Sequence, residues 1–282
     1  DLHAQAAHRL MSRFRFAPDV RLDDVMISFA TDGGGVGPHF DSYDVFLLQL
    51  AGRRRWRVGR MKNPTLQPDV PLKILSHFEP ELEWTLEPGD MLYLPPRWAH
   101  DGVADGDCLT ASIGFRVPSR EEVGCEVLQR MLDAVDEREE GLRYRDPHQP
   151  ATEQPARIPQ PLADFAADAV RRLVDDQDSL ACALGEWLSE PKPQTWFDPV
   201  DECAGPGTVV LDRRTRMLYD DRHVFINGES FIASGRDAKL MRVLADRRSL
   251  DAESVARLGA DARELLQSWA DQGWLHAADI AD

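Results

Sequence analysis

The sequence predicts a mainly β protein with added α-helices, in which a jelly-roll or cupin-like barrel precedes a helical segment and a winged-helix-like domain. Residues 20–117 contain short alternating segments that are rich in β-branched and aromatic residues and are separated by Gly and Pro turns. From Ser119 the apolar residues recur at helical spacing instead. Short strand-like segments and three amphipathic stretches follow residue 205. We therefore expect three parts, at 1–118, 119–204 and 205–282.

The length and composition indicate a globular protein of more than one domain. The chain has 282 residues, of which 43% are hydrophobic, and no apolar run approaches the roughly 18 residues that span a bilayer. Four cysteines lie far apart without a C-x-x-C pair, which indicates free thiols in a reducing cytoplasm. No signal-like stretch follows Asp1, and there is no initiator Met. We expect a cytoplasmic chain that begins inside a longer protein and lacks the N-terminal part of its barrel domain.

The charge balance argues against a nucleic-acid partner. The net charge is -16 and the isoelectric point is near 4.9, whereas binding to a phosphate backbone needs a basic face. Acidity favours a basic partner, although solubility explains it equally well.

Six segments predict the strands of the barrel, and turn signals separate them. They are VRLDDVMISF, YDVFLLQL, RRRWRVG, LEWTLEPGD, MLYLPP and LTASIGFRV. Ser119 and Glu122 then form a capping box, which predicts a helix of about six turns that ends near Gly141. Residues 146–161 are rich in Pro and Gln and predict a loop, and helical periodicity returns from Leu162.

The C-terminal part resembles a winged helix. Strands are expected around TVVLD, RMLYD and HVFIN, with a hairpin turn at Asn227-Gly228 and three helices between Arg236 and Trp274. DNA binding is the usual function of such a module. This segment is not basic, so we expect a structural or protein-contact role and no direct binding to DNA.

Two sequence segments carry the candidate chemistry. In GGGVGPHFDSYD, a Gly-rich turn leads to His39 and Asp41, which face the same side of a strand because they are two residues apart. A His-x-Asp pair alone also occurs by chance. In EPGDMLYLPPRWAH, Pro95 and Pro96 stiffen the approach to His100. Two imidazoles and one carboxylate form the facial triad that suits oxygen-activating Fe(II). His77 has no matching partner and is interpreted as a surface residue.

The combination of GGGVGPHFDSYDVFLLQLAGRRRWRVG and EPGDMLYLPPRWAH resembles the bacterial ribosomal oxygenases of the JmjC superfamily. The resemblance is strong over the barrel and looser over the remaining segments. It implies a double-stranded β-helix barrel, homodimerisation through the helical segment and a C-terminal winged helix. The implied activity is hydroxylation at the β-carbon of an arginine in a large-subunit ribosomal protein, with Fe(II), 2-oxoglutarate and O2.

The resemblance also assigns Arg54 as the residue that binds the 2-oxoglutarate carboxylate, since Arg54 follows the His-x-Asp strand at the family's spacing. A guanidinium suits this role because it can donate two parallel hydrogen bonds to a carboxylate. If Arg54 points inward, Trp56 shares its face, and Arg53, Arg55 and Arg57 lie on the opposite face. Ser112 is a candidate for an additional hydroxyl contact to the same carboxylate. For Ser112 and its same-face neighbour Thr110, a structural hydroxyl is the alternative.

The candidate substrate residues are Asp32 and Asp101, which could accept hydrogen bonds from a target arginine, and Tyr43, which could form a wall of the pocket. A turn or cap role explains the two carboxylates as well, and core packing could account for Tyr43 and for a second aromatic candidate, Trp98. Two alternatives for the function remain. One is a JmjC oxygenase that acts on a histidine or a methyl-lysine side chain. The other is a non-catalytic cupin-like binding or assembly protein, against which the inward polar groups argue.

Overall fold

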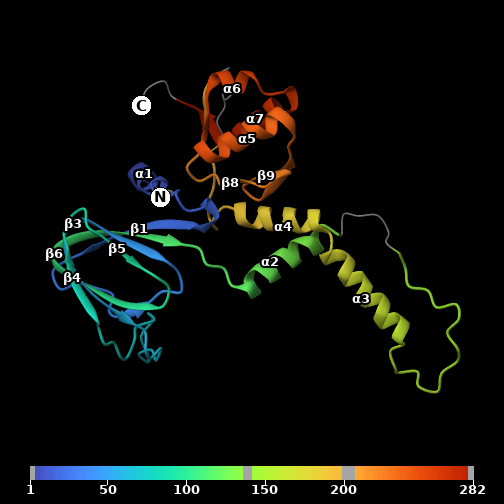
Figure 1. The fold of residues 1–282 in the computed structure, drawn as a ribbon, viewed down its shortest axis with the longest axis horizontal. Coiled ribbons are helices and arrows are strands. Elements are labelled where there is room, and N and C mark those ends of the chain that lie inside the picture. Colours follow the sequence, from blue (N-terminus) through green and yellow to red (C-terminus); the bar gives the residue numbers. More distant parts are fainter. Residues whose placement is uncertain (1–3, 136–141, 199–206, 279–282) are drawn as a thin grey trace. The chain divides into compact units, whose positions relative to one another are not determined.

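The computed structural model describes residues 4–135, 142–198 and 207–278, and it divides the chain into two compact units, Asp1–Val117 and Pro118–Asp282 (Figure 1). Among the described helices, none has the length and apolar character needed to cross a bilayer. The finer division of the second unit, at residues 119–204 and 205–282, stays a prediction.

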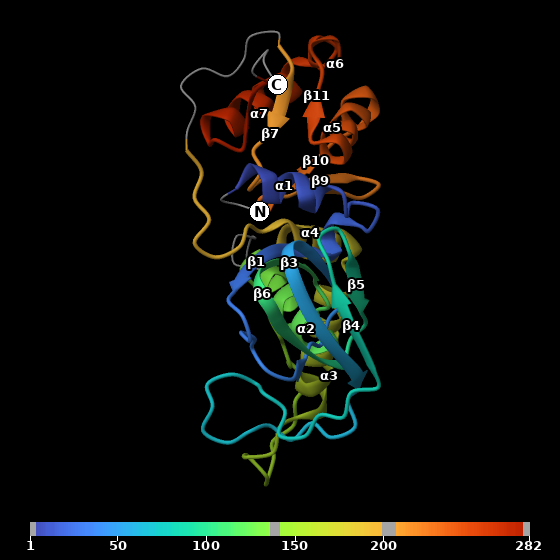
Figure 2. The same ribbon diagram turned by 90° about the vertical axis from the view of Figure 1, so that its left-hand side faces the viewer.

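The first unit is an antiparallel sheet that curls into a barrel-like arrangement, preceded by a short helix (Figure 2). The strand order is β1-β6-β3-β4, while β2 pairs with β6 and β5 pairs with β3. The elements are α1 (Gln5–Ser12), a 3-10 turn (Asp19–Arg21), β1 (Leu22–Ala30), β2 (His39–Phe40), β3 (Val45–Arg60), β4 (Leu82–Leu86), β5 (Met91–Leu94) and β6 (Trp98–Phe115).

Two strands are longer than the sequence predicts. The segments YDVFLLQL and RRRWRVG, expected as separate strands, form the single strand β3. Gly52 has a φ of +64°, and a Cβ at this position would lie 2.1 Å from the carbonyl oxygen of Asp107. The glycine thus allows a bulge that bends β3 while its pairing with β6 continues on both sides. Similarly, β6 runs without interruption from Trp98, so His100 lies within a strand and not in a turn before one.

Alternation along these strands produces two apolar clusters in the first unit. One cluster packs α1 and the turn after it against β1 and β6, and includes Met11, Phe14, Ala111 and Ile113. The other lies between β3, β4 and β5. Its members are Val45, Leu47, Trp56, Val58, Leu86 and Leu94. These contacts hold β3 and β6 together, and those two strands carry most of the residues discussed below.

The second unit begins with three helices. They are α2 (Arg120–Asp133), α3 (Gln160–Val174) and α4 (Gln177–Ser189). The predicted capping box is confirmed, since the Ser119 hydroxyl accepts from the Glu122 backbone N–H at 3.0 Å and the Glu122 carboxylate accepts from the Ser119 N–H at 3.3 Å. The predicted end of this helix near Gly141 lies outside the described residues. Buried residues of α2 and α4 pack together, including Val127 and Ala183.

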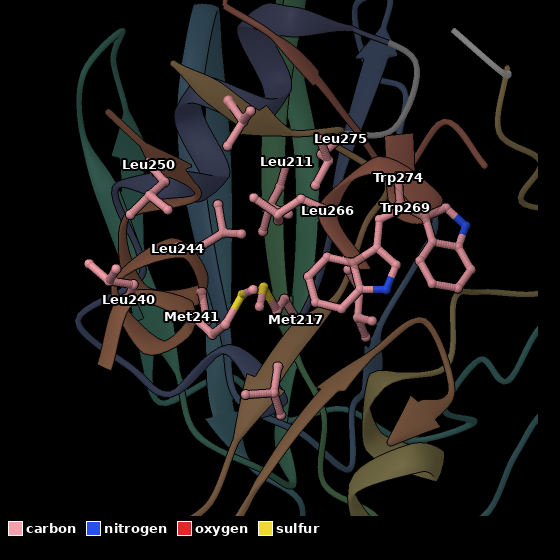
Figure 3. Close-up of a cluster of buried hydrophobic side chains, with 14 of the residues drawn as sticks. Leu211, Met217, Leu240, Met241, Leu244, Leu250, Leu266, Trp269, Trp274 and Leu275 are labelled. Carbon is pink, nitrogen blue, oxygen red and sulfur yellow. The ribbon is translucent and has the colours of Figure 1, made fainter. Parts of the chain in front are cut away.

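The rest of this unit has the strands and helices of a winged helix. Its elements are β7 (Val209–Leu211), β8 (Met217–Tyr219), β9 (His223–Ile226), β10 (Glu229–Ile232), α5 (Gly235–Arg247), β11 (Ser249–Leu250), α6 (Ala252–Ala256), α7 (Ala260–Asp271) and β12 (Leu275–Ala277). Asn227 and Gly228 both have positive φ, as a two-residue hairpin turn requires, so the predicted turn is confirmed. Figure 3 shows the core, where Trp269, Leu244 and Met241 point toward one another. The predicted fold class is therefore confirmed.

Candidate metal centre

His39, Asp41 and His100 lie together on the inner side of the first unit. Strand pairing places His39 directly opposite His100, with ring centroids 4.3 Å apart. One potential ligand atom from each of the three side chains lies within 4.8 Å of the other two, and His100 Nε2 is 3.7 Å from Asp41 Oδ2. Residues that are about sixty positions apart in the sequence thus form one compact group of two imidazoles and one carboxylate.

Both histidines are held in the tautomer that favours metal binding. The Nδ1–H of His39 donates to the carbonyl oxygen of Gly37 at 2.8 Å, and that of His100 donates to the carbonyl oxygen of Trp98 at 3.0 Å. Because a carbonyl only accepts, Nδ1 carries the proton and Nε2 keeps its lone pair. Burial lowers the pKa of His100, and the neighbouring His39 lowers it further, so the imidazole is neutral near pH 7.

The glycine-rich turn before His39 lies against β6, and its close contacts explain the glycines. A Cβ on Gly35 would lie 2.4 Å from the carbonyl oxygen of Gly102, and one on Gly34 would lie 2.8 Å from that of Thr31. Two backbone hydrogen bonds link the turn to β6, from Gly33 N–H to Ala104 O and from Ala104 N–H to Gly34 O. The turn therefore brings the chain to His39 along a path that side chains would obstruct.

Arg54 is a buried cation on the wall of the same cavity. Its side chain donates to the Gly102 carbonyl at 3.1 Å and to Thr110 Oγ1 at 3.5 Å, and its guanidinium carbon lies 5.0 Å from the centre of the Trp56 ring. Burial lowers the pKa of Arg54, because removing the charged guanidinium from water is unfavourable. Within the described part of the chain its buried Nε has no hydrogen-bond partner. An unpaired buried donor on a cation fits a carboxylate ligand.

The arginines flanking Arg54 follow the predicted alternation along β3. Each pairs with an acidic residue on the opposite face from the cavity: Arg53 with Asp105 at 2.8 Å, Arg55 with Glu83 at 4.0 Å, and Arg57 with Asp101.

Thr110 and Gln49 support Arg54, and the sequence did not single out Gln49. Thr110 Oγ1 accepts from Arg54 and donates to Gln49 Oε1 at 3.0 Å, while Gln49 Nε2 donates to the Ala51 carbonyl at 2.9 Å. Gln49 is 1% exposed. A lone amide in the apolar strand VFLLQL was the signal that could have identified it. Ser112, the predicted partner of the carboxylate, lines the cavity together with Thr110.

The cavity has a volume of about 710 Å³. The three candidate ligands, Arg54 and Trp56 lie on its wall together with Asp23, Asp24, Met26, Ser28, Tyr43 and Ser112.

Tyr43 is thus brought to the cavity, whereas Asp32 and Asp101 are not among the residues that line it. Asp32 accepts from the Gly106 backbone N–H at 2.9 Å, which is a turn role, and the buried Asp101 carboxylate pairs with Arg57 on the outer face. Asp101 lies within β6, where alternation turns it away from His100. A substrate role for Asp32 and Asp101 stays a prediction. Trp98 is also not among the lining residues, and His77 is exposed as expected.

Family models match both units. Residues 9–123 match the model described as JmjC domain, and residues 172–276 match the one described as ROXA-like winged helix. The ribosomal protein uL16 3-hydroxylase of Escherichia coli strain K12 is 36% identical over an alignment of 261 residues that covers 87% of this chain and 67% of that protein. A probable ribosomal oxygenase of Haemophilus influenzae is 30% identical over 309 residues, covering 94% of this chain and 73% of the relative.

Solved structures agree with this assignment. The ribosomal oxygenase YcfD from Escherichia coli, solved in complex with cobalt and 2-oxoglutarate, superposes with a TM-score of 0.77 at 31% identity, covering 98% of this chain and 76% of that one. The match thus extends over both the JmjC part and the winged-helix part. This chain belongs to the JmjC-domain ribosomal oxygenases.

Proposed function

We propose that this chain is an Fe(II)- and 2-oxoglutarate-dependent protein hydroxylase that adds a hydroxyl group to the β-carbon of an arginine in a bacterial large-subunit ribosomal protein. One observation carries the proposal. Two imidazoles and one carboxylate converge in a cavity whose wall holds a buried arginine with an unpaired donor. Membership of the ribosomal oxygenases supports the same activity.

In this proposal the three ligands hold Fe(II) through His39 Nε2, His100 Nε2 and an Asp41 oxygen. Three protein ligands on one side of an octahedral ion leave positions for the co-substrates. The bound iron supplies activation of O2, coupled to oxidative decarboxylation of 2-oxoglutarate. Arg54 binds the far carboxylate of 2-oxoglutarate through charge-assisted hydrogen bonds, and the contacts with Gly102 and Thr110 fix its orientation. The curled sheet holds these groups in fixed positions relative to one another.

The rest of the cavity suits a cationic side chain. Asp23 and Asp24 supply carboxylates, while Met26 supplies an apolar wall, which is the combination that a guanidinium on an aliphatic stem needs. Burial and the neighbouring Asp41, which accepts a hydrogen bond from the phenol, raise the pKa of Tyr43 to about 12, so this phenol stays protonated. The net charge of -16 supports attraction of a basic ribosomal protein. Homodimerisation through residues 119–204 and a cytoplasmic location stay predictions.

The test is turnover of 2-oxoglutarate to succinate with Fe(II) and ascorbate, followed by mass spectrometry of ribosomal proteins after the reaction. The proposal expects addition of one oxygen atom to an arginine peptide, and loss of both product and succinate in His39→Ala. Oxygen on a histidine, or loss of a methyl group from lysine, would reassign the substrate within the same family. Absence of any turnover by a protein that binds Fe(II) and 2-oxoglutarate would indicate a binding or assembly protein instead.

A further inference from the structure

The long connection between β3 and β4, residues 61–81, has an ordered structure of its own. Leu66 and Leu75 form an isolated bridge, with a backbone hydrogen bond from Gln67 N–H to Ile74 O at 2.8 Å and another from Ser76 N–H to Thr65 O at 2.9 Å. Although most of the connection is exposed, Ile74 is 6% exposed and Leu75 is 2% exposed. Neither residue belongs to the apolar clusters of the first unit. Their burial therefore requires another explanation.

Ile74 and Leu75 lie against Gly37 and Pro38, the two residues that immediately precede His39. The Leu75 N–H donates to the Pro38 carbonyl at 2.7 Å. A Cβ built on Gly37 would lie 3.4 Å from Ile74 Cγ2 and 3.6 Å from Ile74 Cδ1. The isoleucine side chain thus lies beside Gly37, at a distance that would be ordinary van der Waals contact for a Cβ at this position. Gly37 has a φ of +98°, a conformation that glycine adopts without strain.

The backbone of Gly37, just before Pro38, sets the orientation of the His39 imidazole. Gly37 O accepts the hydrogen bond from His39 Nδ1, and this bond fixes both the tautomer and the rotation of the ring. A rotation of the Gly37-Pro38 peptide would move this carbonyl and release the imidazole. Glycine has the freest backbone of all residues, so a packed neighbour is needed to hold that peptide in one orientation. Ile74 and Leu75 are that neighbour.

We propose that Ile74 and Leu75 are positioning residues of the metal centre, which hold His39 Nε2 toward the metal through Gly37 and Pro38. The connection between β3 and β4 then has a role in metal affinity although it contributes no ligand. This inference rests on the proposed function, because it requires that His39 binds a metal. Partners that orient a metal-binding histidine typically contribute about 10–100-fold in metal affinity.

The experiment is titration of the metal-free protein with Co(II), read from the visible absorption of the bound ion. Ile74→Ala removes the side chain that covers Gly37, and Ile74→Val keeps most of it. Ile113→Ala is the matched control, since Ile113 is also a buried isoleucine of the same unit, 0% exposed against 6% for Ile74, and packs in the cluster beneath α1. The melting temperature of each metal-free variant reports the general loss of stability.

We expect Ile74→Ala to bind Co(II) at least about tenfold more weakly and to shift the Co(II) absorption bands, since the geometry around the ion changes. Ile74→Val should bind nearly as tightly as the unchanged protein. Ile113→Ala should lower the melting temperature and leave both the affinity and the bands unchanged. If Ile74→Ala lowers only the melting temperature, in the way that Ile113→Ala does, the positioning role is refuted. If the unchanged protein does not bind Co(II), the proposed function itself fails, and the two failures are thereby distinguished.

Discussion

Gly102 should determine how tightly the protein binds 2-oxoglutarate, and Gly102→Ala tests this. The residue lies on β6, where its carbonyl accepts from Arg54. A Cβ at this position would lie 2.6 Å from Cζ3 and 2.7 Å from Cη2 of Trp56, and 2.8 Å from Nε of Arg54. Because non-bonded carbon atoms pack at about 3.5–4.0 Å, the indole ring would have to move by about 1 Å. Trp56 and Arg54 are both buried between β6 and the cavity, so the added methyl group would push them toward the space in which 2-oxoglutarate is proposed to bind.

The expected size of the effect of Gly102→Ala on 2-oxoglutarate binding follows from the free-energy cost of overpacking. Inserting one methyl group into a packed interior costs about 1–3 kcal/mol. If displacement of the guanidinium weakens binding of the carboxylate by that amount, the KM for 2-oxoglutarate rises about 5- to 150-fold. Binding of Co(II) or Fe(II) should change less, because the three atoms nearest the added methyl group belong to Trp56 and Arg54 and not to the candidate metal ligands. The predicted pattern is thus a selective loss of co-substrate affinity.

The assay measures succinate formation against 2-oxoglutarate concentration, with metal affinity measured separately. Gly124→Ala is the control, since a Cβ on Gly124 meets no atom within 4 Å and alanine suits its helix. This variant should keep an unchanged KM for 2-oxoglutarate. An unchanged KM in Gly102→Ala would refute the reasoning. So would an equal loss of metal and 2-oxoglutarate affinity, since that would indicate a general disruption of the barrel.

Three further outcomes are expected. Thr110→Val removes a hydroxyl that contacts Arg54, so the KM for 2-oxoglutarate should rise about fivefold, whereas Thr110→Ser should keep it near its original value. Ser119→Ala removes a helix cap and should lower the free energy of unfolding of the second unit by about 1 kcal/mol, measured by urea denaturation. Burial alone would raise the pKa of Asp212, but hydrogen bonds from Arg214 hold it below its ordinary value. The stabilisation that the Asp212 carboxylate gives the folded protein is present above about pH 4 and is lost as the pH falls through the lowered pKa. In Arg214→Met the free energy of unfolding should therefore fall less steeply over this pH range, as measured by urea denaturation at several pH values.

Local patterns in the sequence identified most of the fold. The capping box at Ser119, the Asn227-Gly228 turn and the strand segments of the barrel each depend on neighbouring residues, so they can be recognised without knowledge of the tertiary structure. Strand continuity through Gly52 could not be recognised in this way. A glycine between two apolar segments is typical of a turn, and pairing with a distant strand decides whether it forms a bulge instead.

The site was predictable to the extent that its residues share a strand face. His39 and Asp41 follow from two-residue spacing. The inward direction of Arg54 rests on the family resemblance, and the position of Trp56 on the same face then follows from the spacing rule. The direction of the Asp101 side chain was not predicted, because the first strand segment expected after His100 was LTASIGFRV, whereas β6 already begins at Trp98. Gln49 and the buried part of the connection between β3 and β4 were missed, since their roles depend on contacts across strands that no spacing in the sequence encodes.

The pairing of β3 with β6 links the two halves of the site. It places Arg54 opposite Ala104, Trp56 opposite Gly102 and Val58 opposite His100. The Trp56 ring lies 6.0 Å from the His100 ring and 5.0 Å from the Arg54 guanidinium carbon, so one side chain contacts both the metal-ligand region and the carboxylate-binding region. Because side chains alternate, a slip of one residue in this pairing would turn Arg54 and Trp56 outward and bring Arg53 and Arg55 into the cavity. The register therefore sets the distance between the candidate metal ligands and Arg54, and the close approach at Gly102 is what permits that register.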